Sequence, residues 1–190
     1  MRVLHVDSGR EWRGGQQQVW LLCRELARHA DVEQTLVTRL DSELVRRVAA
    51  DGGRVRGTAW EIGLDPRAWW QLRRAISSFQ PDLIHVHDSH ALALAATVTM
   101  GRRLIGTRRV DFHVGRFGAW RRPDRIIAVS AAVKQVLISD GIAPDAVVVI
   151  PDGIDPEEVR AASTPPLGIR RQLRLEEKTP LAVNAAALVD

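Results

Sequence analysis

Short apolar runs alternate with amphipathic stretches along the chain. The apolar runs have the length and composition of strands that are buried on both faces of a parallel sheet. In the stretches between them, apolar residues recur three or four positions apart, as Val19, Leu22 and Leu26 do, which is typical of amphipathic helices. Strands are therefore predicted at Val3–Val6, Glu33–Thr38, Arg54–Trp60, Leu83–His87, Arg103–Thr107, Arg125–Val129, Ala146–Ile150 and Leu181–Leu188.

Polar caps and glycines mark where the helices begin and end. Asp65 precedes Pro66, the usual order of an N-cap and a first helical residue, and Ser130 stands as an N-cap before another helical pattern. The alternation of strands and helices predicts an α/β fold with a Rossmann-like, doubly wound parallel sheet. Helices are predicted over Gly15–His29, from Asp41 or Ser42 to Gly52-Gly53, from Asp65 to Phe79, from Ser89 to Met100, from Ser130 to Asp140 and over Ile169–Leu175, with a loop at Asp111–Arg122.

The composition is that of a globular protein, with 45% hydrophobic and 26% charged residues among 190. The net charge of +4 comes almost entirely from arginine, since Lys134 and Lys178 are the only lysines. No lysine-rich run or aromatic RNA-binding pattern accompanies it, so nucleic acid is not an expected partner. Cys23 is the only cysteine, no signal peptide is expected, and no apolar run reaches the ~20 residues of a membrane helix. A cytoplasmic location is expected.

Polar residues follow most of the predicted strands. The carboxyl ends of parallel strands meet at one edge of a sheet, where α/β folds bind their ligands. Gly14-Gly15 opens a helix at this edge, and a helix N-terminus beside glycine lets a phosphate approach the backbone closely. The G-x-G-x-x-G and G-x-x-x-x-G-K-[ST] fingerprints are absent, so a plain dinucleotide or P-loop site is not predicted. The edge residues are Asp7-Ser8, Gly14-Gly15, His87-Asp88, Arg108-Arg109, Ser130 and Asp152-Gly153.

The densest polar cluster runs from His85 to His90. Alternation along a strand places His85 and His87 on the same face, a spacing that suits a metal ion, as in binuclear metallohydrolases. Such a site needs further ligands from later strands, and no histidine follows His113, so no metal is expected. The alternative leaves His85 in the core, with His87, Asp88 and His90 recognising ligand hydroxyl groups.

Arg108-Arg109 follows the fifth strand, and adjacent residues of a strand point to opposite faces. One arginine can pair with Asp111. The other can bind an anionic ligand, because a guanidinium group matches the geometry of phosphate and carboxylate. His113 is either a base or hydroxyl ligand, or a surface histidine without a role.

Tryptophan and arginine also occur together in two further segments. Exposed tryptophan beside arginine suits a peripheral membrane contact or a lipid-linked substrate. The alternative is that Trp69 belongs to the core and the arginines are solvated. The segments are Trp69-Trp70 with Arg67, Arg73 and Arg74, and Phe117 and Trp120 with Arg116, Arg121 and Arg122.

Several motifs together resemble those of family 4 glycosyltransferases over nearly the whole chain. Ile126–Val133 is similar to the I-I-A-V-S-x-x-V strand and helix of that family. Val147–Asp155 is similar to its V-x-V-I-P-N-G-I-D segment, with Asp152 in place of the commoner Asn. Further similar segments are Glu11–Gln17, His85–His90 and Thr107–Phe112.

The resemblance implies one half of a GT-B fold, in which two Rossmann-like domains face each other across the active site. It implies an N-terminal acceptor domain over 1–160, a linker with a short helix over 161–180, and the first strand of a C-terminal donor domain over 181–190. The rest of the donor domain would be missing. Members of the family are retaining enzymes that use a nucleotide-sugar as donor substrate, mostly without a bound metal. No cofactor is expected in this domain, and the chain is expected to be inactive alone.

The resemblance also implies roles for residues. Gly14 and Gly15 would line the cleft near the donor diphosphate. Arg109 stands where the family usually has a histidine, so Arg109 and His113 are the candidate catalytic residues. A stand-alone nucleotide- or phosphate-binding module and a metallohydrolase that uses His85–His90 remain as alternatives. A sugar or lipid-linked acceptor is expected to contact His87, Asp88, His90, Arg109 and Asp111. If the acceptor is lipid-linked, the enzyme is expected at the inner face of a membrane.

Overall fold

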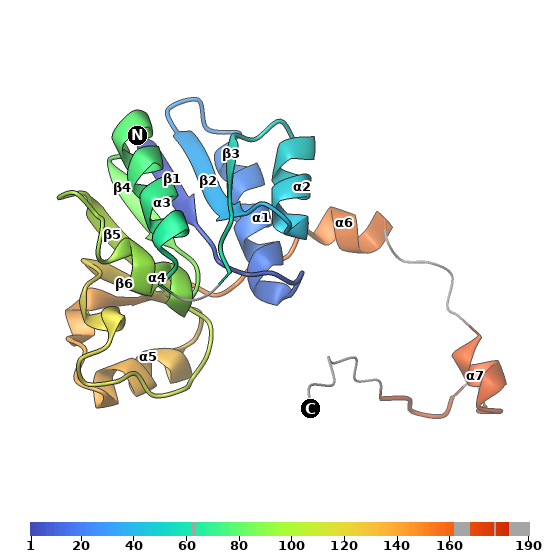
Figure 1. The fold of residues 1–190 in the computed structure, drawn as a ribbon. Helices are drawn as coiled ribbons and strands as arrows, with labels where there is room; N and C mark the ends of the chain where they lie inside the picture. Colours follow the sequence, from blue (N-terminus) through green and yellow to red (C-terminus); the bar gives the residue numbers. More distant parts are fainter. Residues whose placement is uncertain (62–63, 162–167, 177, 183–190) are drawn as a thin grey trace. The chain divides into compact units, whose positions relative to one another are not determined.

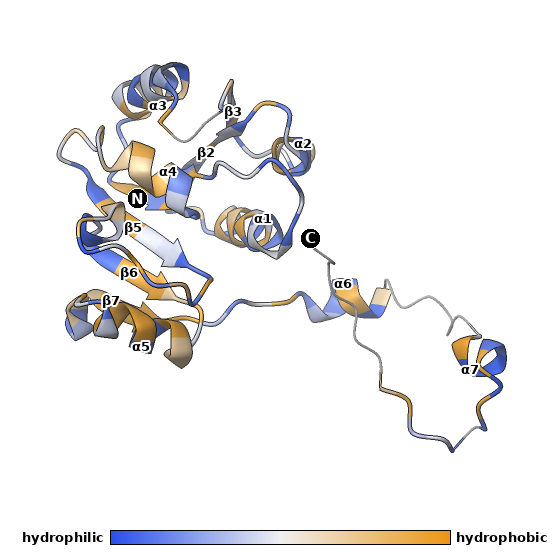
Figure 2. Ribbon diagram, turned by 60° about the horizontal axis from the view of Figure 1, so that its bottom comes forward, coloured by the Kyte–Doolittle hydropathy of each residue, from blue (hydrophilic) through white to orange (hydrophobic). Residues whose placement is uncertain are grey.

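The computed structural model describes residues 1–61, 64–161, 168–176 and 178–182. The chain divides into two compact units, Met1–Gly153 and Ile154–Asp190. In the second unit the structure describes the short helices α6 (Pro156–Ala161) and α7 (Ile169–Gln172), which carry both hydrophilic and hydrophobic residues (Figure 2). No helix within the described ranges is long and apolar enough to cross a membrane.

One parallel sheet forms the centre of the first unit (Figure 1). The strand order is β3-β2-β1-β4-β5-β6-β7, and every neighbouring pair is parallel. The chain moves outward from β1 to β3, crosses back to β4 and continues in the other direction, which confirms the doubly wound arrangement. The strands are β1 (Arg2–Val6), β2 (Glu33–Arg39), β3 (Val55–Thr58), β4 (Leu83–Val86), β5 (Arg103–Arg108), β6 (Arg125–Ala128) and β7 (Val147–Val149).

Helices cover the sheet on both faces. Right-handed connections place the helices between β1 and β3 on one face and those between β3 and β7 on the other. The two packed clusters agree, since Trp20 and Leu44 meet Leu36 in one, and Leu72 meets Leu4 in the other. The helices are α1 (Gly14–Leu26) and α2 (Glu43–Ala50) on the first face, and α3 (Pro66–Phe79), α4 (Ser89–Ala95) and α5 (Ala131–Ser139) on the second, with short turns η1 (Ala119–Arg121) and η2 (Pro144–Ala146).

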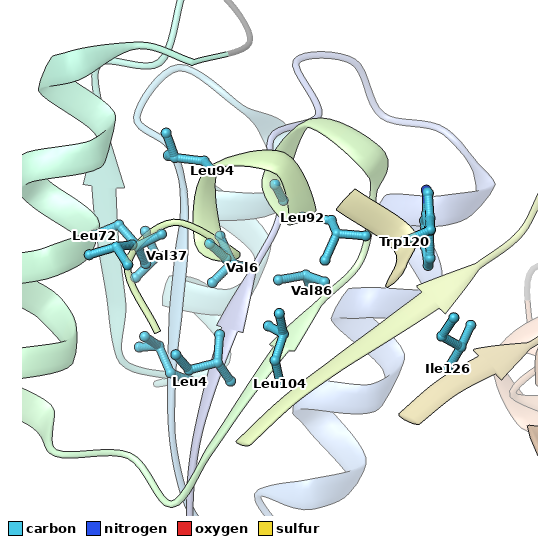
Figure 3. Packing of buried hydrophobic residues seen from close by; sticks show 14 of the residues in the cluster. Leu4, Val6, Val37, Leu72, Val86, Leu92, Leu94, Leu104, Trp120 and Ile126 are labelled. Atoms are coloured by element: carbon cyan, nitrogen blue, oxygen red, sulfur yellow. The ribbon is translucent and has the colours of Figure 1, made fainter. Parts of the chain in front are cut away.

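The larger core lies between the sheet and α3, α4 and α5. Figure 3 shows Leu4, Val86 and Leu104 of neighbouring strands together with Leu72 and Leu92 of the helices. Burying each of these side chains contributes about 1.5–3 kcal/mol relative to leaving it exposed. This packing fixes the positions of the strands, and therefore of the residues at their carboxyl ends.

The helix caps follow the prediction at three starts and differ at the fourth. The side chains of Ser42, Asp65 and Ser130 each accept a hydrogen bond from a backbone N–H at the start of α2, α3 and α5. The fourth prediction was wrong, because Asp88 and not Ser89 caps α4. The Asp88 carboxylate accepts two amide bonds at this position, so α4 begins at Ser89, one residue earlier than a cap at Ser89 would have placed its start.

Three helix ends differ from the prediction, and one helix was not predicted. Helix α1 ends at Leu26 and not at His29, and α7 ends at Gln172 and not at Leu175. Helix α4 stops at Ala95 and does not reach Met100, because the hydroxyl group of Thr97 donates to a carbonyl of the last turn and competes with helical bonding. Helix α6 was not predicted. Asp155 precedes it and accepts two amide bonds from its first turn, and Pro156 is its first residue, the same Asp-Pro order that predicted α3.

Two predictions for the C-terminal part fall largely outside the described residues. Residues 183–188 of the strand predicted at Leu181–Leu188 are outside the described residues. Residues 162–167 of the predicted linker are also outside them. The domain boundaries at 160 and 180 therefore stay predictions.

Three buried histidines lie side by side in the sheet, on the face that α1 covers. His5 of β1 is adjacent to His85 and His87 at β4, with ring centroids 4.1 to 5.5 Å apart. Burial lowers the pKa of His5 to about 4, with Gln34 acting in the opposite direction. Burial also holds the pKa of His85 and His87 well below its ordinary value, and the neighbouring histidines and Arg109 add to this. All three rings are therefore neutral near pH 7.

We expect the fold to lose stability as the pH falls from 7 to 5. The unfolded chain protonates histidine near pH 6.5, whereas folded His5 stays neutral down to about pH 4, so stability present above pH 6.5 is lost on acidification. For His5 alone the loss is about 3 kcal/mol by pH 4. Asp7 acts in the opposite direction, because its raised pKa of about 7 lets the folded state take up one proton, but three histidines outweigh it.

Thermal unfolding followed by circular dichroism at several pH values measures this effect. The matched control is His90→Gln, because His90 is an exposed histidine outside the cluster. The control should lose melting temperature on acidification as much as the unchanged chain does. A melting temperature that stays constant between pH 7 and pH 5 would show that the three rings are not held neutral.

Candidate functional site

The carboxylate of Asp88 joins the ends of β1 and β4. It accepts hydrogen bonds from the backbone N–H of Ser8 at 2.7 Å and from the Ser8 hydroxyl group at 2.6 Å. It also accepts the two α4 amide bonds, at 2.9 and 2.8 Å. Four donors within the protein therefore fix this side chain and, through Ser8, the loop that follows β1.

Asp7 is a buried acid at the end of β1, with 1% of its surface exposed. Its carboxyl group accepts bonds from Gly9 N at 2.9 Å and from Gln16 Nε2 at 3.2 and 3.3 Å. Burial, followed by repulsion from Asp88, raises its pKa to about 7. Any side chain at Gly9 would collide with Gln16. The sequence placed Asp7 at this edge by its position after a strand, but it gave no sign of this burial.

Helix α1 presents free amide groups at the edge. Its N-cap, Arg13, makes no side-chain cap bond, and no acidic residue occurs in the first turn. A Cβ at Gly14 would have no neighbour within 4 Å, and one at Gly15 would meet only Arg109 Cδ, at 3.9 Å. The positive end of the helix dipole therefore lies beside a guanidinium group on an open surface, which suits a phosphate group.

The guanidinium group of Arg109 is held by two partners. Its Nη1 donates to the carbonyl oxygen of His87 at 3.2 Å, and its Nε donates to Asp152 Oδ1 at 3.3 Å. The next residue, Gly153, exchanges two hydrogen bonds with the Gln18 side chain of α1, at 2.7 and 3.0 Å. The ends of β4, β5 and β7 therefore meet at α1, which confirms that polar groups gather at this edge.

The predicted acceptor contacts differ in whether their side chains are accessible. The ring of His87 is buried in the histidine cluster, and only its carbonyl group faces Arg109. Asp88 is bonded within the protein, as described above. His90 and Asp111 are exposed. The structure thus brings Arg109 to the glycine turn, keeps His87 inside and leaves His90 and Asp111 open to solvent.

His113 is bonded at the far end of α5. Its Nδ1 lies 2.6 Å from Asp140 Oδ1, and Val114 N donates to the other carboxylate oxygen at 2.7 Å. These two contacts lower the pKa of Asp140, that of the Val114 amide most strongly. Asp140 follows the last turn of α5 and Ser130 precedes its first. Because a crossover helix runs back from the ligand edge, the bond to Asp140 holds His113 away from that edge.

The histidine cluster presents three ring nitrogens within 4.8 Å of one another, near enough for one metal ion. Its geometry favours hydrogen bonding. His5 Nδ1 and His87 Nε2 are 3.1 Å apart while the ring centroids are 5.3 Å apart at 24°, so the two nitrogens face each other in line. Zinc ligands instead converge on one point from tetrahedral directions. His85 Nε2 lies 2.7 Å from Thr107 Oγ1, which extends the network.

A cavity of about 620 Å³ opens beyond the ends of β2 and β3. The largely buried side chain of Arg39 forms two hydrogen bonds with Asp41, at 3.1 and 3.3 Å, and Arg10 and Glu61 also line the cavity. This volume is in the range of small-molecule sites. The sequence analysis missed this cavity, because its residues come from three loops and none belongs to a recognisable motif.

A protein-family model described as Glycosyltransferase Family 4 matches residues 12–158. The matched range contains the glycine turn, Asp88 and Arg109. No curated protein sequence matched this chain significantly.

Solved structures share the fold at low sequence identity. Anabaena Alr3699/HepE in complex with UDP-glucose has a TM-score of 0.72 and 16% identity, over 92% of this chain and 50% of that one. A glycosyltransferase from Rickettsia africae ESF-5 has a TM-score of 0.70 and 16% identity, over 94% and 51%. UDP-GlcNAc 2-epimerase from Neisseria meningitidis, bound to UDP-GlcNAc, has a TM-score of 0.61 and 15% identity, over 80% and 47%.

The chain therefore spans about half the length of these structures and has the Rossmann-like fold of one half of a GT-B enzyme. The family match covers most of the first compact unit, including every strand that contributes to the polar edge except β1. On this evidence, the chain belongs to glycosyltransferase family 4.

Proposed function

We propose that this domain is the acceptor-binding half of a retaining glycosyltransferase, which transfers a sugar from a nucleotide-sugar to a glycan, a small molecule or a lipid-linked acceptor. The observation that carries the proposal is the open, uncapped N-terminus of α1 beside Arg109. The complexes of HepE with UDP and UDP-glucose support a nucleotide-sugar donor, and the half-length match supports a separate donor domain that faces this edge.

The α1 N-terminus and Arg109 would stabilise the departing diphosphate. Negative charge develops on the diphosphate oxygens as the bond to the sugar breaks, and preorganised donors lower the energy of that charge. The amides of Gly14 and Gly15 and the Arg109 guanidinium are such donors. Asp152 and the His87 carbonyl already hold the guanidinium group in place, so little reorganisation accompanies the reaction. We propose no bound cofactor for this domain.

The acceptor would bind along the same edge, in the cavity beyond β2 and β3 and against His90 and Asp111. The carboxylates of Asp41 and Glu61 and the guanidinium of Arg10 can bond to sugar hydroxyl groups there. His113 would have to leave Asp140 to reach this edge, so Arg109 is the better candidate for a catalytic residue.

The buried, unpaired thiol of Cys23 suits a reducing compartment, so we propose a cytoplasmic enzyme that works at the inner face of a membrane where the acceptor is lipid-linked. A stand-alone phosphate- or nucleotide-binding module is the second candidate, because the α1 N-terminus and Arg109 can hold a phosphate without another domain. Tight binding of UDP or GDP by this chain would favour the second candidate.

The 190-residue chain alone is expected to show no transfer or hydrolysis of UDP- or GDP-sugars, because it lacks the proposed donor domain. Release of UDP or GDP, measured by chromatography, tests this, and calorimetry should detect weak nucleotide binding at most. Clear turnover by the isolated chain would refute the proposed division between acceptor and donor domains.

In a form that includes a donor domain, Arg109→Gln should lower kcat about 100-fold, the usual effect of removing one preorganised charge-stabilising donor. Arg109→Lys should retain more activity, because it keeps the positive charge but loses the paired bonds to His87 and Asp152. Arg28→Gln is the control, since Arg28 is paired with Glu25 after α1. If Arg109→Gln remains within about twofold of the unchanged enzyme, Arg109 has no part in the transition state.

A further inference from the structure

Positive charge is concentrated in one part of the chain. Residues 64–125 contain eleven arginines, five aspartates and no lysine or glutamate, a net charge of +6, whereas the whole chain carries +4. The rest of the chain is therefore slightly acidic. The basic segment forms α3, α4, η1 and the strands β4 and β5, so its exposed charge lies mainly on the side of the sheet that α3, α4 and η1 cover.

Four of the five aspartates in this segment bond to backbone amides. Asp65 and Asp88 cap α3 and α4. Asp82 accepts a bond from Arg2 N, and Asp124 accepts one from Leu104 N, both at 2.7 Å. These carboxylates serve local structure. In the described part of the chain, no ion pair joins an arginine of α3 to an acidic side chain, although Arg67 interacts electrostatically with the Asp65 cap.

Large apolar side chains stand among these arginines. On the outer side of α3, Trp70 is 56% exposed, and the Arg74 guanidinium lies over its ring at 5.5 Å. In the loop before η1, Phe117 is 95% exposed, next to Arg116. Each ring therefore adds exposed apolar surface among positively charged side chains.

Both groups of residues belong to one side of the molecule. Leu72 of α3 and Trp120 of η1 pack into the same core, and α4 contacts both elements. Trp69 of α3 also donates a hydrogen bond to Thr97, which follows α4, at 3.0 Å. We call this surface the basic–aromatic face; it consists of Arg67, Trp70, Arg73, Arg74, Arg116, Phe117 and Arg122.

We propose that the basic–aromatic face docks on the surface of an anionic lipid bilayer. Each arginine near anionic headgroups strengthens partitioning about five-fold. The rings of Trp70 and Phe117 match the headgroup level of a bilayer, where amphipathic and aromatic side chains are favoured. A cavity of about 600 Å³ opens beside Phe117 and is lined by Arg116 and Arg121 together with Asp140.

Nucleic acid would be attracted by the same charge, but the aromatic residues fit it less well. Stacking of bases needs an open ring face, whereas the Arg74 guanidinium lies over one face of the Trp70 ring. This proposal rests on the membrane location included in the proposed function, but docking on lipid requires neither a donor domain nor a nucleotide-sugar, so it can fail or succeed apart from the transfer reaction.

Co-sedimentation with vesicles tests the proposal on the 190-residue chain. We expect binding to vesicles of equal parts phosphatidylcholine and phosphatidylglycerol, little binding to phosphatidylcholine alone, and loss of binding at ~1 M salt, where the Debye length falls to about 3 Å. Arg67→Glu with Arg74→Glu should weaken binding at least 25-fold, since two favourable contributions of about five-fold are lost. Trp70→Ser and Phe117→Ser should each weaken it at unchanged charge.

The matched control reverses the same charges on other surfaces. Arg28→Glu with Arg46→Glu changes two exposed arginines after α1 and in α2 and should retain most of the binding. Unchanged circular dichroism and melting temperature establish that each variant is folded. The proposal is overturned if the anionic vesicles do not bind at low salt, if the control weakens binding as much as the α3 variant, or if a single-stranded oligonucleotide binds more tightly than the vesicles.

Discussion

The polar edge of this domain depends on the four hydrogen bonds to the Asp88 carboxylate. Those bonds start α4 and tie the loop after β1 to the end of β4. A charge held in this way repels a second charge nearby, which contributes to the raised pKa of Asp7. Asp7 in turn holds Gly9 and Gln16, so the chain enters α1 at a fixed angle with its first amides free. The position of the free α1 amides therefore depends on two neighbouring carboxyl groups, the buried Asp7 and the half-buried Asp88.

Most of the fold could be predicted because its local signals agree with its packing. Apolar runs, Asp-Pro and serine caps, and the order of strands and helices all indicate a doubly wound sheet, and the seven strands of the first unit lie where the patterns predict them. The ends of α4 were harder to predict. Its start depends on Asp88 rather than Ser89 acting as the N-cap, and its end depends on one hydrogen bond from the Thr97 hydroxyl group. Such competition between neighbouring groups is decided by geometry that a residue pattern does not contain.

The site could be predicted only in outline. That strand ends gather polar residues follows from parallel topology, and Gly15 and Arg109 do meet there. Which side chains remain free is a separate matter. His87 and Asp88 stand at the predicted edge, but the His87 ring is buried with two other histidines. The Asp88 carboxylate oxygens already accept hydrogen bonds from the protein. The histidine cluster itself joins β1 to β4 across 80 residues of sequence, a pairing that is set by register and not by any local motif.

Arg108 and Arg109 show how one dipeptide connects the two surfaces of the domain. Alternation along β5 sends them to opposite faces. Arg109 reaches α1 and the glycine turn, whereas Arg108 lies 5.1 Å over the ring of Trp120 and donates to the carbonyl of Phe112 at 2.7 Å. Arg108 therefore holds the loop that carries Phe117, while its neighbour forms part of the proposed diphosphate site. Because Arg108 ends β5 and Arg109 follows it directly, a bilayer that binds the basic–aromatic face would meet the domain in an orientation fixed relative to the polar edge.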